Sequence, residues 1–292
     1  MTVIRSIVFV SLVSIALPIA AGQDGSYLAS ITRWRASHEA ALRADEGWLT
    51  VVGLAWLKAG PNRAGTGPDA AVRLPAGAPR SVGVFGLGGD QVTFEPAAGA
   101  SVAVNGKPAS SSQRLRPDID TITSGGLTLF IIERAGRYGV RIKDRDSEAR
   151  RAFGGETWYP VREAWRVVAR FEPYHPPKVI QVLNVLGQTD PQPSPGAALF
   201  TLDGKQYRLD PISEGGQLFF IFKDATTGAT TYPSGRFLYA SPPVNGQVIL
   251  DFNKAENPPC AFTDFATCPL PPRQNQLTTS VDAGERYEKR RH

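Results

Sequence analysis

Polar side chains that could carry chemistry gather in the last third of the chain. Residues 224–236 place Asp, Thr, Tyr and Arg side chains between two predicted strands, and residues 251–257 follow a third. Loops at strand ends commonly display functional side chains, because a rigid scaffold positions them. The sequence therefore predicts a ligand-binding pocket, with candidate residues Asp224, Thr226, Tyr232, Arg236, Asp251, Asn253 and Asn257.

Arg236 has two interpretations that the sequence leaves open. An arginine side chain can form a two-pronged contact with a carboxylate or a phosphate. The functional interpretation places Arg236 in one pocket with a ligand's anion or with Asp251, Asn253 or Glu256. The structural interpretation makes Arg236 part of a salt bridge, while Thr226 and Thr231 cap turns.

Carboxylates supply the candidates for catalysis. Asp251 and Glu285 are candidate acid–base residues of a hydrolase, in which Arg236 would stabilise developing negative charge. The chain has only three histidines, so acid–base chemistry would depend on carboxylates, Tyr232 or Arg236. We interpret His38, at the edge of a predicted helix, as a packed side chain rather than a ligand. This shortage of histidine favours a binding protein over a hydrolase.

The standard catalytic and cofactor motifs are absent from the sequence. It contains no G-x-S-x-G, H-E-x-x-H or C-x-x-C motif and no phosphate-binding glycine loop. Asp144 and Asp146 lie two residues apart, but the calcium-loop pattern does not continue after them. We therefore expect no metal and no cofactor.

The first residues of the chain have the features of an export signal. Arg5 is followed by an apolar run over 7–19 and by the small residues Ala20-Ala-Gly22. This pattern predicts cleavage near Gly22 and a periplasmic or secreted protein. The apolar run is shorter than the roughly 20 residues of a membrane-spanning helix, and we expect no span in the mature chain.

The two cysteines of the chain, Cys260 and Cys268, lie in a proline-rich loop. In an exported protein, such a closely spaced pair predicts a disulfide. Closing this small loop would contribute about 2–3 kcal/mol. Free thiols are the alternative, since a metal site would need histidines nearby.

The net charge is +5, and part of it comes from the basic tail. The basic residues do not form a stripe with interleaved aromatic residues, so we expect no nucleic-acid partner. A small molecule or a glycan is the expected ligand.

The hydrophobic pattern predicts a mainly β protein. Apolar residues recur at a spacing near 3.6 over 26–44, which predicts one helix. Short runs of period two then predict a β-sandwich followed by a barrel-like antiparallel sheet, with the helix over an open end or the seam. Asn105-Gly106 is a predicted hairpin turn, and the prolines between 173 and 195 are interpreted as strand stops. The predicted segments are the signal peptide 1–22, the N-terminal helix 23–46, the sandwich 47–152, the C-terminal β-unit 153–285 and the tail 286–292.

Three motifs of the second half are TYPSGRFL (231–238), LDFNKAENPPCAF (250–262) and CPLPP (268–272). They resemble those of a bacterial family known as the domain of unknown function DUF1684. Asn275, residues 283–285 and, in the first half, GLAWL (53–57) and RIKD (141–144) extend the resemblance over nearly the whole mature chain. The family implies no activity. Glu256 stands where the family pattern suggests an aromatic residue, which argues against a required catalytic glutamate at that position.

The first half also resembles a forkhead-associated (FHA) β-sandwich, at Arg80-Ser81, at the Val104-Asn-Gly106 turn and in its final hairpin. FHA domains grip phosphothreonine through Gly-Arg and Ser-x-x-His patterns. In this chain Gly67 is followed by Pro68 instead of an arginine. Ser81 is followed three positions later by Val84 instead of a histidine. The resemblance therefore implies the fold without phosphopeptide binding.

Three functions are consistent with these observations. The first is a binder of a small polar or anionic ligand, with Trp165 or Tyr232 as an apolar wall. The second is a cell-envelope hydrolase that uses the carboxylates and Arg236. The third is a non-catalytic scaffold whose polar motifs hold loops together.

Overall fold

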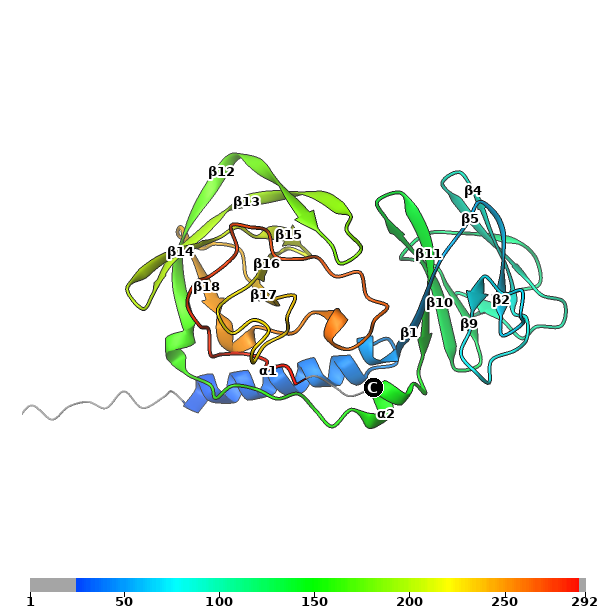
Figure 1. Ribbon diagram of the computed structural model, residues 1–292, viewed down its shortest axis with the longest axis horizontal. Coiled ribbons are helices and arrows are strands. Elements are labelled where there is room, and N and C mark those ends of the chain that lie inside the picture. Colours follow the sequence, from blue (N-terminus) through cyan, green and yellow to red (C-terminus); the bar gives the residue numbers. More distant parts are fainter. Residues whose placement is uncertain (1–24, 289–292) are drawn as a thin grey trace, which may run out of the picture.

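The computed structural model describes residues 25–288 (Figure 1), so the predicted signal peptide lies outside the described residues. The chain begins with α1 (Gly25–Arg43), which confirms the predicted helix. Ile31 and Leu42 are its buried residues. Trp34 and His38 follow Ile31 at helical spacing, so they share its face. Within the described residues no helix is both long and apolar enough to cross a membrane.

The first unit is a sandwich of two β-sheets. One sheet has the order β1-β11-β10-β9-β6-β7 and the other β3-β2-β4-β5-β8. The strands of the first sheet are β1 (Val51–Trp56), β6 (Ala103–Val104), β7 (Lys107–Pro108), β9 (Thr121–Ser124), β10 (Leu127–Arg134) and β11 (Arg137–Asp144). Those of the second are β2 (Gly60–Gly65), β3 (Val72–Arg73), β4 (Gly83–Gly88), β5 (Gln91–Pro96) and β8 (Gln113–Leu115).

The core of the sandwich lies between these sheets. Phe85 and Phe94 of one sheet pack with their ring centroids 5.0 Å apart, and Val140 and Ile142 of β11 join them in one apolar cluster. Successive side chains of a strand point to opposite faces. Arg141, between two core residues, therefore projects from the outer face of the six-stranded sheet.

The predicted turn at Asn105-Gly106 is confirmed. Asn105 has φ 50° and Gly106 φ 75°, and these residues join β6 to β7. Both residue types adopt positive φ at low cost, which suits a tight hairpin.

A short connection leads to the second unit. It contains α2 (Glu148–Ala152) and the 3-10 turn η2 (Glu163–Trp165). The strands of a four-stranded antiparallel sheet follow, in the order β14 (Lys205–Leu209), β13 (Thr189–Leu202), β12 (Arg166–Leu183) and β18 (Gln247–Asp251). A three-stranded sheet has the order β15 (Ile212–Glu214), β16 (Gln217–Phe222) and β17 (Arg236–Ala240).

These two sheets correct the prediction of a barrel-like sheet. Phe220 and Leu238 of one sheet and Leu250 of the other belong to one buried cluster. The strands β17 and β18 lie at the edges of different sheets and share no ladder. The unit is therefore closed by side-chain packing between open sheets rather than by backbone hydrogen bonds.

The prolines interpreted as strand stops lie inside strands, so that interpretation was wrong. β12 runs through Pro173, Pro176 and Pro177 with an irregularity in its register, and β13 includes Pro191 and Pro193. Prolines at alternate positions remove N–H groups from one side of a strand only. On the side of β13 away from β12, the ladder with β14 involves only Ala198–Leu202, so β14 does not pair with the proline-containing part of β13.

The last segment of the second unit, residues 252–288, is here named the strap. It contains the 3-10 turns η3 (Phe252–Lys254) and η4 (Pro259–Ala261). Isolated bridges attach it to earlier parts of the chain, pairing Phe237 with Glu256 and Trp158 with Glu285. The strap thus brings side chains from the end of the sequence onto the second unit.

Helix α1 runs along the second unit, and its C-terminal end lies near the start of the sandwich (Figure 1). Tyr27 Oη donates a 2.9 Å hydrogen bond to Asp251 Oδ1, and Arg35 Nη2 donates to the Tyr159 carbonyl at 3.0 Å. These contacts fix the helix on the second unit, where it contributes to the candidate site.

Candidate functional site

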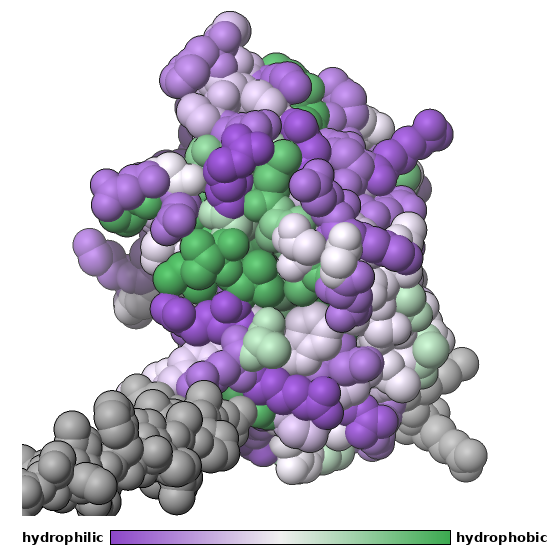
Figure 2. All heavy atoms as spheres, turned by 90° about the vertical axis from the view of Figure 1, so that its left-hand side faces the viewer, coloured by the Kyte–Doolittle hydropathy of each residue, from purple (hydrophilic) through white to green (hydrophobic). Residues whose placement is uncertain are grey.

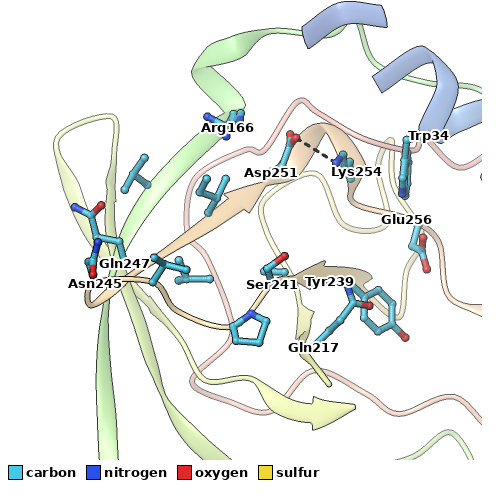
Figure 3. A pocket seen from close by; sticks show the side chains of 16 residues that line it. Trp34, Arg166, Gln217, Tyr239, Ser241, Asn245, Gln247, Asp251, Lys254 and Glu256 are labelled. Carbon is cyan, nitrogen blue, oxygen red and sulfur yellow. Dashed lines mark ion pairs between the residues drawn. The ribbon is translucent and has the colours of Figure 1, made fainter. Parts of the chain in front are cut away.

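One hollow of the second unit, here named the groove, has a volume of about 690 Å³. Trp34 of α1, Tyr239 of β17 and Asp251 of β18 line it, together with Lys254 and Glu256 of the strap. Figure 3 shows Asp251 facing Lys254 at one end of the groove, with Trp34 and Glu256 beside them. The groove therefore joins residues from the first and last parts of the described chain.

Asp251 is held in place from two sides. Tyr27 Oη donates to its Oδ1 at 2.9 Å, and Asn253 Nδ2 donates to the same oxygen at 3.3 Å. Burial, followed by the hydrogen bond to Asp251, raises the pKa of Tyr27, so the phenol remains a donor. Oδ2 of Asp251 lies 4.0 Å from Lys254 Nζ, a separation that leaves both groups able to contact a ligand.

The outer faces of β12 and β18 form an apolar wall of the groove. Val168 and Ile249 are register partners on these strands, and their exposed fractions are 53% and 41%. Val244, which is 70% exposed, also lines the groove. Figure 2 shows apolar side chains gathered on this side of the molecule. The wall replaces the predicted one, since Trp165 packs against the core and Tyr232 binds the Cys260 carbonyl through its hydroxyl.

Arg236 does not share a pocket with Asp251, which corrects the functional interpretation of this residue. It is fully buried, and its Nη2 lies 2.6 Å from Asp224 Oδ2, also fully buried. Nη2 also donates to the Val281 carbonyl, and Nη1 donates to the Ala283 carbonyl. The guanidinium therefore ties the β17 strand to the strap.

Asp224, Thr226 and Asn253 are likewise committed to the fold. Asp224 Oδ1 accepts hydrogen bonds from the backbone and hydroxyl of Thr226, at 2.7 and 2.6 Å. Asn253 bonds the Arg162 backbone in both directions, with distances of 3.1 and 2.8 Å. Because all three are buried and bonded to the chain, the seven predicted ligand-binding residues do not form one pocket.

Glu285 lies in a buried cluster behind the groove. It is fully buried, and its Oε2 accepts a hydrogen bond from the Asn257 backbone N–H. Asn257 in turn donates through Nδ2 to the Arg286 carbonyl at 3.0 Å. Burial, then Glu156, raises the pKa of Glu285 well above its usual value.

His38 connects this cluster to the groove. Its Nδ1 lies 3.2 Å from Glu256 Oε2, and its Nε2 lies 3.8 Å from Glu285 Oε2. The imidazole stacks on Trp34 with a centroid distance of 5.4 Å and meets the edge of Trp158. Glu256 therefore contacts His38 on one side and lines the groove on the other.

A second hollow, here named the cleft, has a volume of about 560 Å³. Arg134 and Arg141 of the sandwich line it, and Cys268 lines it from the strap. Tyr239 and Glu256 line both the cleft and the groove, so the two hollows meet at these residues.

Both cysteines are free thiols in the structure, so the predicted disulfide is not formed in it. The Cys260 backbone N–H donates to Cys268 Sγ at 3.1 Å. A hydrogen bond from the Cys268 thiol lowers the pKa of Cys260, and the same bond raises the pKa of Cys268. Burial raises the pKa of Tyr232, whose hydroxyl donates to the Cys260 carbonyl, to about 12.

Within residues 25–288, no group of three or more His, Cys, Asp or Glu side chains is placed to hold a metal ion. The groove also contains three residues that the sequence patterns did not predict, namely Trp34, Lys254 and Arg166. His38 was interpreted only as a packed side chain. Trp34 and His38 lie on one predicted helix face, a pattern equally typical of packing. Only the folded strap brings Glu256 and Glu285 to that face.

The chain belongs to the family described as "Protein of unknown function (DUF1684)", whose model matches residues 151–286. This match covers the second unit and most of the strap. No curated protein matches the sequence.

Solved structures resemble parts of the chain. An uncharacterized protein from Haloarcula marismortui, solved by NMR, is 33% identical over 47% of this chain and 78% of its own, with a TM-score of 0.40. The FhaA FHA domain, solved in complex with an intracellular domain, is 22% identical over 31% of this chain and 97% of its own, with a TM-score of 0.22. An FHA domain studied for phosphothreonine-dependent interactions is 22% identical over 31% and 92%, with a TM-score of 0.23.

Proposed function

We propose that this protein binds a small polar ligand with an apolar face in the groove of its second unit. The observation that carries the proposal is the convergence of an apolar wall and a polar end in one hollow. Val168, Val244 and Ile249 expose apolar surface, while Asp251 and Lys254 present opposite charges at one end. Ligand pockets typically combine mostly apolar walls with a few well-placed polar groups, in volumes of about 300–1,000 Å³.

A sugar is the first ligand to test. Sugar rings have an apolar C–H face and a rim of hydroxyl groups. Trp34 and Tyr239 offer aromatic surface, and Asn245, Gln217 and Gln247 offer amide groups that both donate and accept hydrogen bonds. Arg236 has no direct role in this proposal, because its side chain is enclosed by Asp224 and the strap.

A titration of tryptophan fluorescence with mono- and oligosaccharides tests the proposal. Asp251→Asn should weaken binding by about tenfold, the usual effect of losing one charged hydrogen bond. Asp282→Asn is the control, because Asp282 is exposed and does not line the groove. If Asp251→Asn binds the ligand with the same affinity as the wild type, or if Trp34→Ala leaves the affinity unchanged, the ligand binds elsewhere.

Hydrolysis is a second candidate function, favoured by the contact between His38 and Glu256 at the junction of the two hollows. This activity would be particular to this chain, because the family pattern suggests an aromatic residue at position 256. Glu256 would take a proton from an attacking water and deliver it to the leaving-group oxygen of a glycoside or ester. His38 would orient and stabilise the carboxylate. Glu285 would act through His38, because it is fully buried.

Glu256→Gln separates the two functions. In a hydrolase this change should retain ligand binding but reduce turnover of chromogenic glycosides or esters by at least about 10²-fold. If no substrate is turned over by the wild type, or if Glu256→Gln is as fast, the protein is a binder only.

We also propose that the protein is exported and that Cys260 and Cys268 become oxidised to a disulfide outside the cytoplasm. The pattern of residues 1–22 supports export, and the hydrogen bond between the two cysteines supports the pairing. Protein isolated from its own envelope should start near Gln23 by mass spectrometry. It should show no thiols when unfolded without a reductant, whereas two reactive thiols would exclude the disulfide.

A further inference from the structure

Arg141 is a buried cation without a carboxylate partner. Its exposed fraction is only 4%. No carboxylate oxygen of the described residues lies within 4.0 Å of its guanidinium, although other arginines of residues 25–288 have such a partner. Burying an unpaired charge is costly, so a protein normally provides an opposite charge.

The hydrogen bonds of Arg141 are also incomplete. Its one hydrogen bond to the described residues runs from Nη2 to Thr267 Oγ1 and is long, at 3.5 Å. Its Nε is buried without any acceptor. The ring of Trp48 lies 5.1 Å from its guanidinium carbon and supplies a flat surface that holds the group in place. A fixed guanidinium with free donors is suited to bind an oxyanion.

The surroundings make this end of the cleft cationic. Arg134 reaches the same Thr267 hydroxyl through Nε at 3.2 Å. Its nearest carboxylate is Asp118, which lies 3.7 Å away and is largely exposed. Burial, and then the charge of Arg134, lowers the pKa of Arg141 to about 10, so Arg141 is still charged at neutral pH.

The acidic residues of the cleft do not neutralise Arg141. Asp190, Glu214 and Glu256 also line the cleft, but no ion pair joins any of them to Arg141. Glu214 is within 3.4 Å of Tyr239 Oη, and Glu256 contacts His38. Asp118 is the carboxylate that most favours the charged form of Arg141, and it is largely exposed.

We infer that the cleft between the sandwich and the second unit binds the anionic group of a small molecule, held by Arg141, Arg134 and Thr267. A phosphate or carboxylate accepts two parallel hydrogen bonds from one guanidinium. The cleft volume of about 560 Å³ accommodates the rest of a small molecule, whose apolar part would lie against Phe219 and Phe237. This site is separate from the polar end of the groove, so its existence does not depend on the proposed function.

Calorimetric titration of the full mature protein with inorganic phosphate tests this site, with sodium chloride to match ionic strength. Acetate is titrated in a second arm, which distinguishes a phosphate from a carboxylate ligand. We expect saturable binding of at least one of these anions. Arg141→Gln should weaken it by at least about tenfold, the usual effect of losing a charge-assisted hydrogen bond.

Arg137→Gln is the matched control. Arg137 is on the same strand and the same face as Arg141, but it is exposed and lies over Trp56. The Arg137→Gln variant should bind the anions with the same affinity as the wild type. If Arg141→Gln does not fold, Arg134→Gln replaces it, because Arg134 is partly exposed and its loss leaves no buried cavity. Absence of saturable binding to both anions, or equal affinities in the Arg141 and Arg137 variants, would overturn the inference.

Discussion

Arg236 and Arg141 are both almost completely buried, but their surroundings are opposite. Arg236 has Asp224 at 2.6 Å and two backbone carbonyls as acceptors. Arg141 has one long hydrogen bond to a hydroxyl and no carboxylate of the described residues within ion-pair distance. The comparison shows that burial of a cation does not by itself identify a binding site. What matters is whether the fold already supplies its counter-charge.

The two arginines also sit in different structural settings. Arg236 lies inside the second unit, where it joins β17 to the strap. Arg141 projects from the outer face of the sandwich into a cleft lined by both units. A cleft between two packed units can admit a ligand, whereas a packed core leaves no room for one beside a buried side chain.

Removing the counter-charge of Arg236 should have the largest effect on stability. Asp224→Asn keeps the shape of the side chain but leaves the Arg236 charge buried and unpaired. We expect a loss of about 3–5 kcal/mol in the free energy of unfolding, measured by urea denaturation. The double variant Asp224→Asn/Arg236→Met, which keeps the Oδ1 acceptor for Thr226, should recover much of this loss. If it is no more stable than Asp224→Asn, the cost arises from lost packing rather than from the unpaired charge.

Glu285 sharpens the comparison, because a buried acid can neutralise itself whereas a buried arginine cannot. The folded pKa of Glu285 is raised above its unfolded value, so the folded state keeps a proton that the unfolded state has lost. Its stability contribution is complete below the unfolded pKa and is lost as pH rises through the folded pKa. As the pH rises through this range, the wild type should therefore lose stability relative to Glu285→Gln by up to about 1.4 kcal/mol per pH unit.

Unfolding measurements from pH 4 to pH 9 check this dependence. Glu156, Glu256 and His38 face the same cluster and are kept unchanged in both proteins, so the difference between the curves isolates Glu285. Parallel curves for the wild type and Glu285→Gln would show that Glu285 is ionised in the folded protein.

A single hydrogen bond to a carboxylate sets the lower end of the scale. Tyr27→Phe removes the hydroxyl that Asp251 and Asn253 share on α1. We expect a loss of about 1.5 kcal/mol, because hydrogen bonds to charged groups contribute about 1.5–3 kcal/mol and this one is only partly buried. The thermal midpoint, compared with that of Tyr207→Phe on the exposed β14 strand, checks the value. No change in the midpoint would indicate that α1 is held by its apolar face alone.

Local patterns predicted much of the fold. The helical spacing of apolar residues gave α1, and the Asn105-Gly106 dipeptide gave a hairpin, because both depend on neighbours in sequence. Prolines in β12 and β13 misled the prediction, because their effect depends on which side of the strand has a partner. The open arrangement of the second unit depends on packing between sheets, which local patterns do not report.

The candidate site was less predictable than the fold. Asp251 and Glu256 line the groove, but Arg236 and Asp224 form an enclosed pair, and residue type alone does not distinguish the two cases. His38 and Glu256 are far apart in sequence and meet only because the strap returns to α1. Arg141 lies in a strand that was predicted as part of the sandwich. Whether it has a counter-charge depends on residues that only the fold brings near it.

Equilibrium unfolding of Arg236→Met and Arg141→Met, side by side in a low-salt buffer without phosphate or carboxylates, tests the central comparison most directly. Methionine replaces most of the volume of each side chain and removes its charge. We predict that Arg236→Met loses about 3–5 kcal/mol, because Asp224 is left unpaired, and that Arg141→Met changes by no more than about 1 kcal/mol in either direction. An equally large loss for Arg141→Met would contradict the account, since both arginines would then be structural.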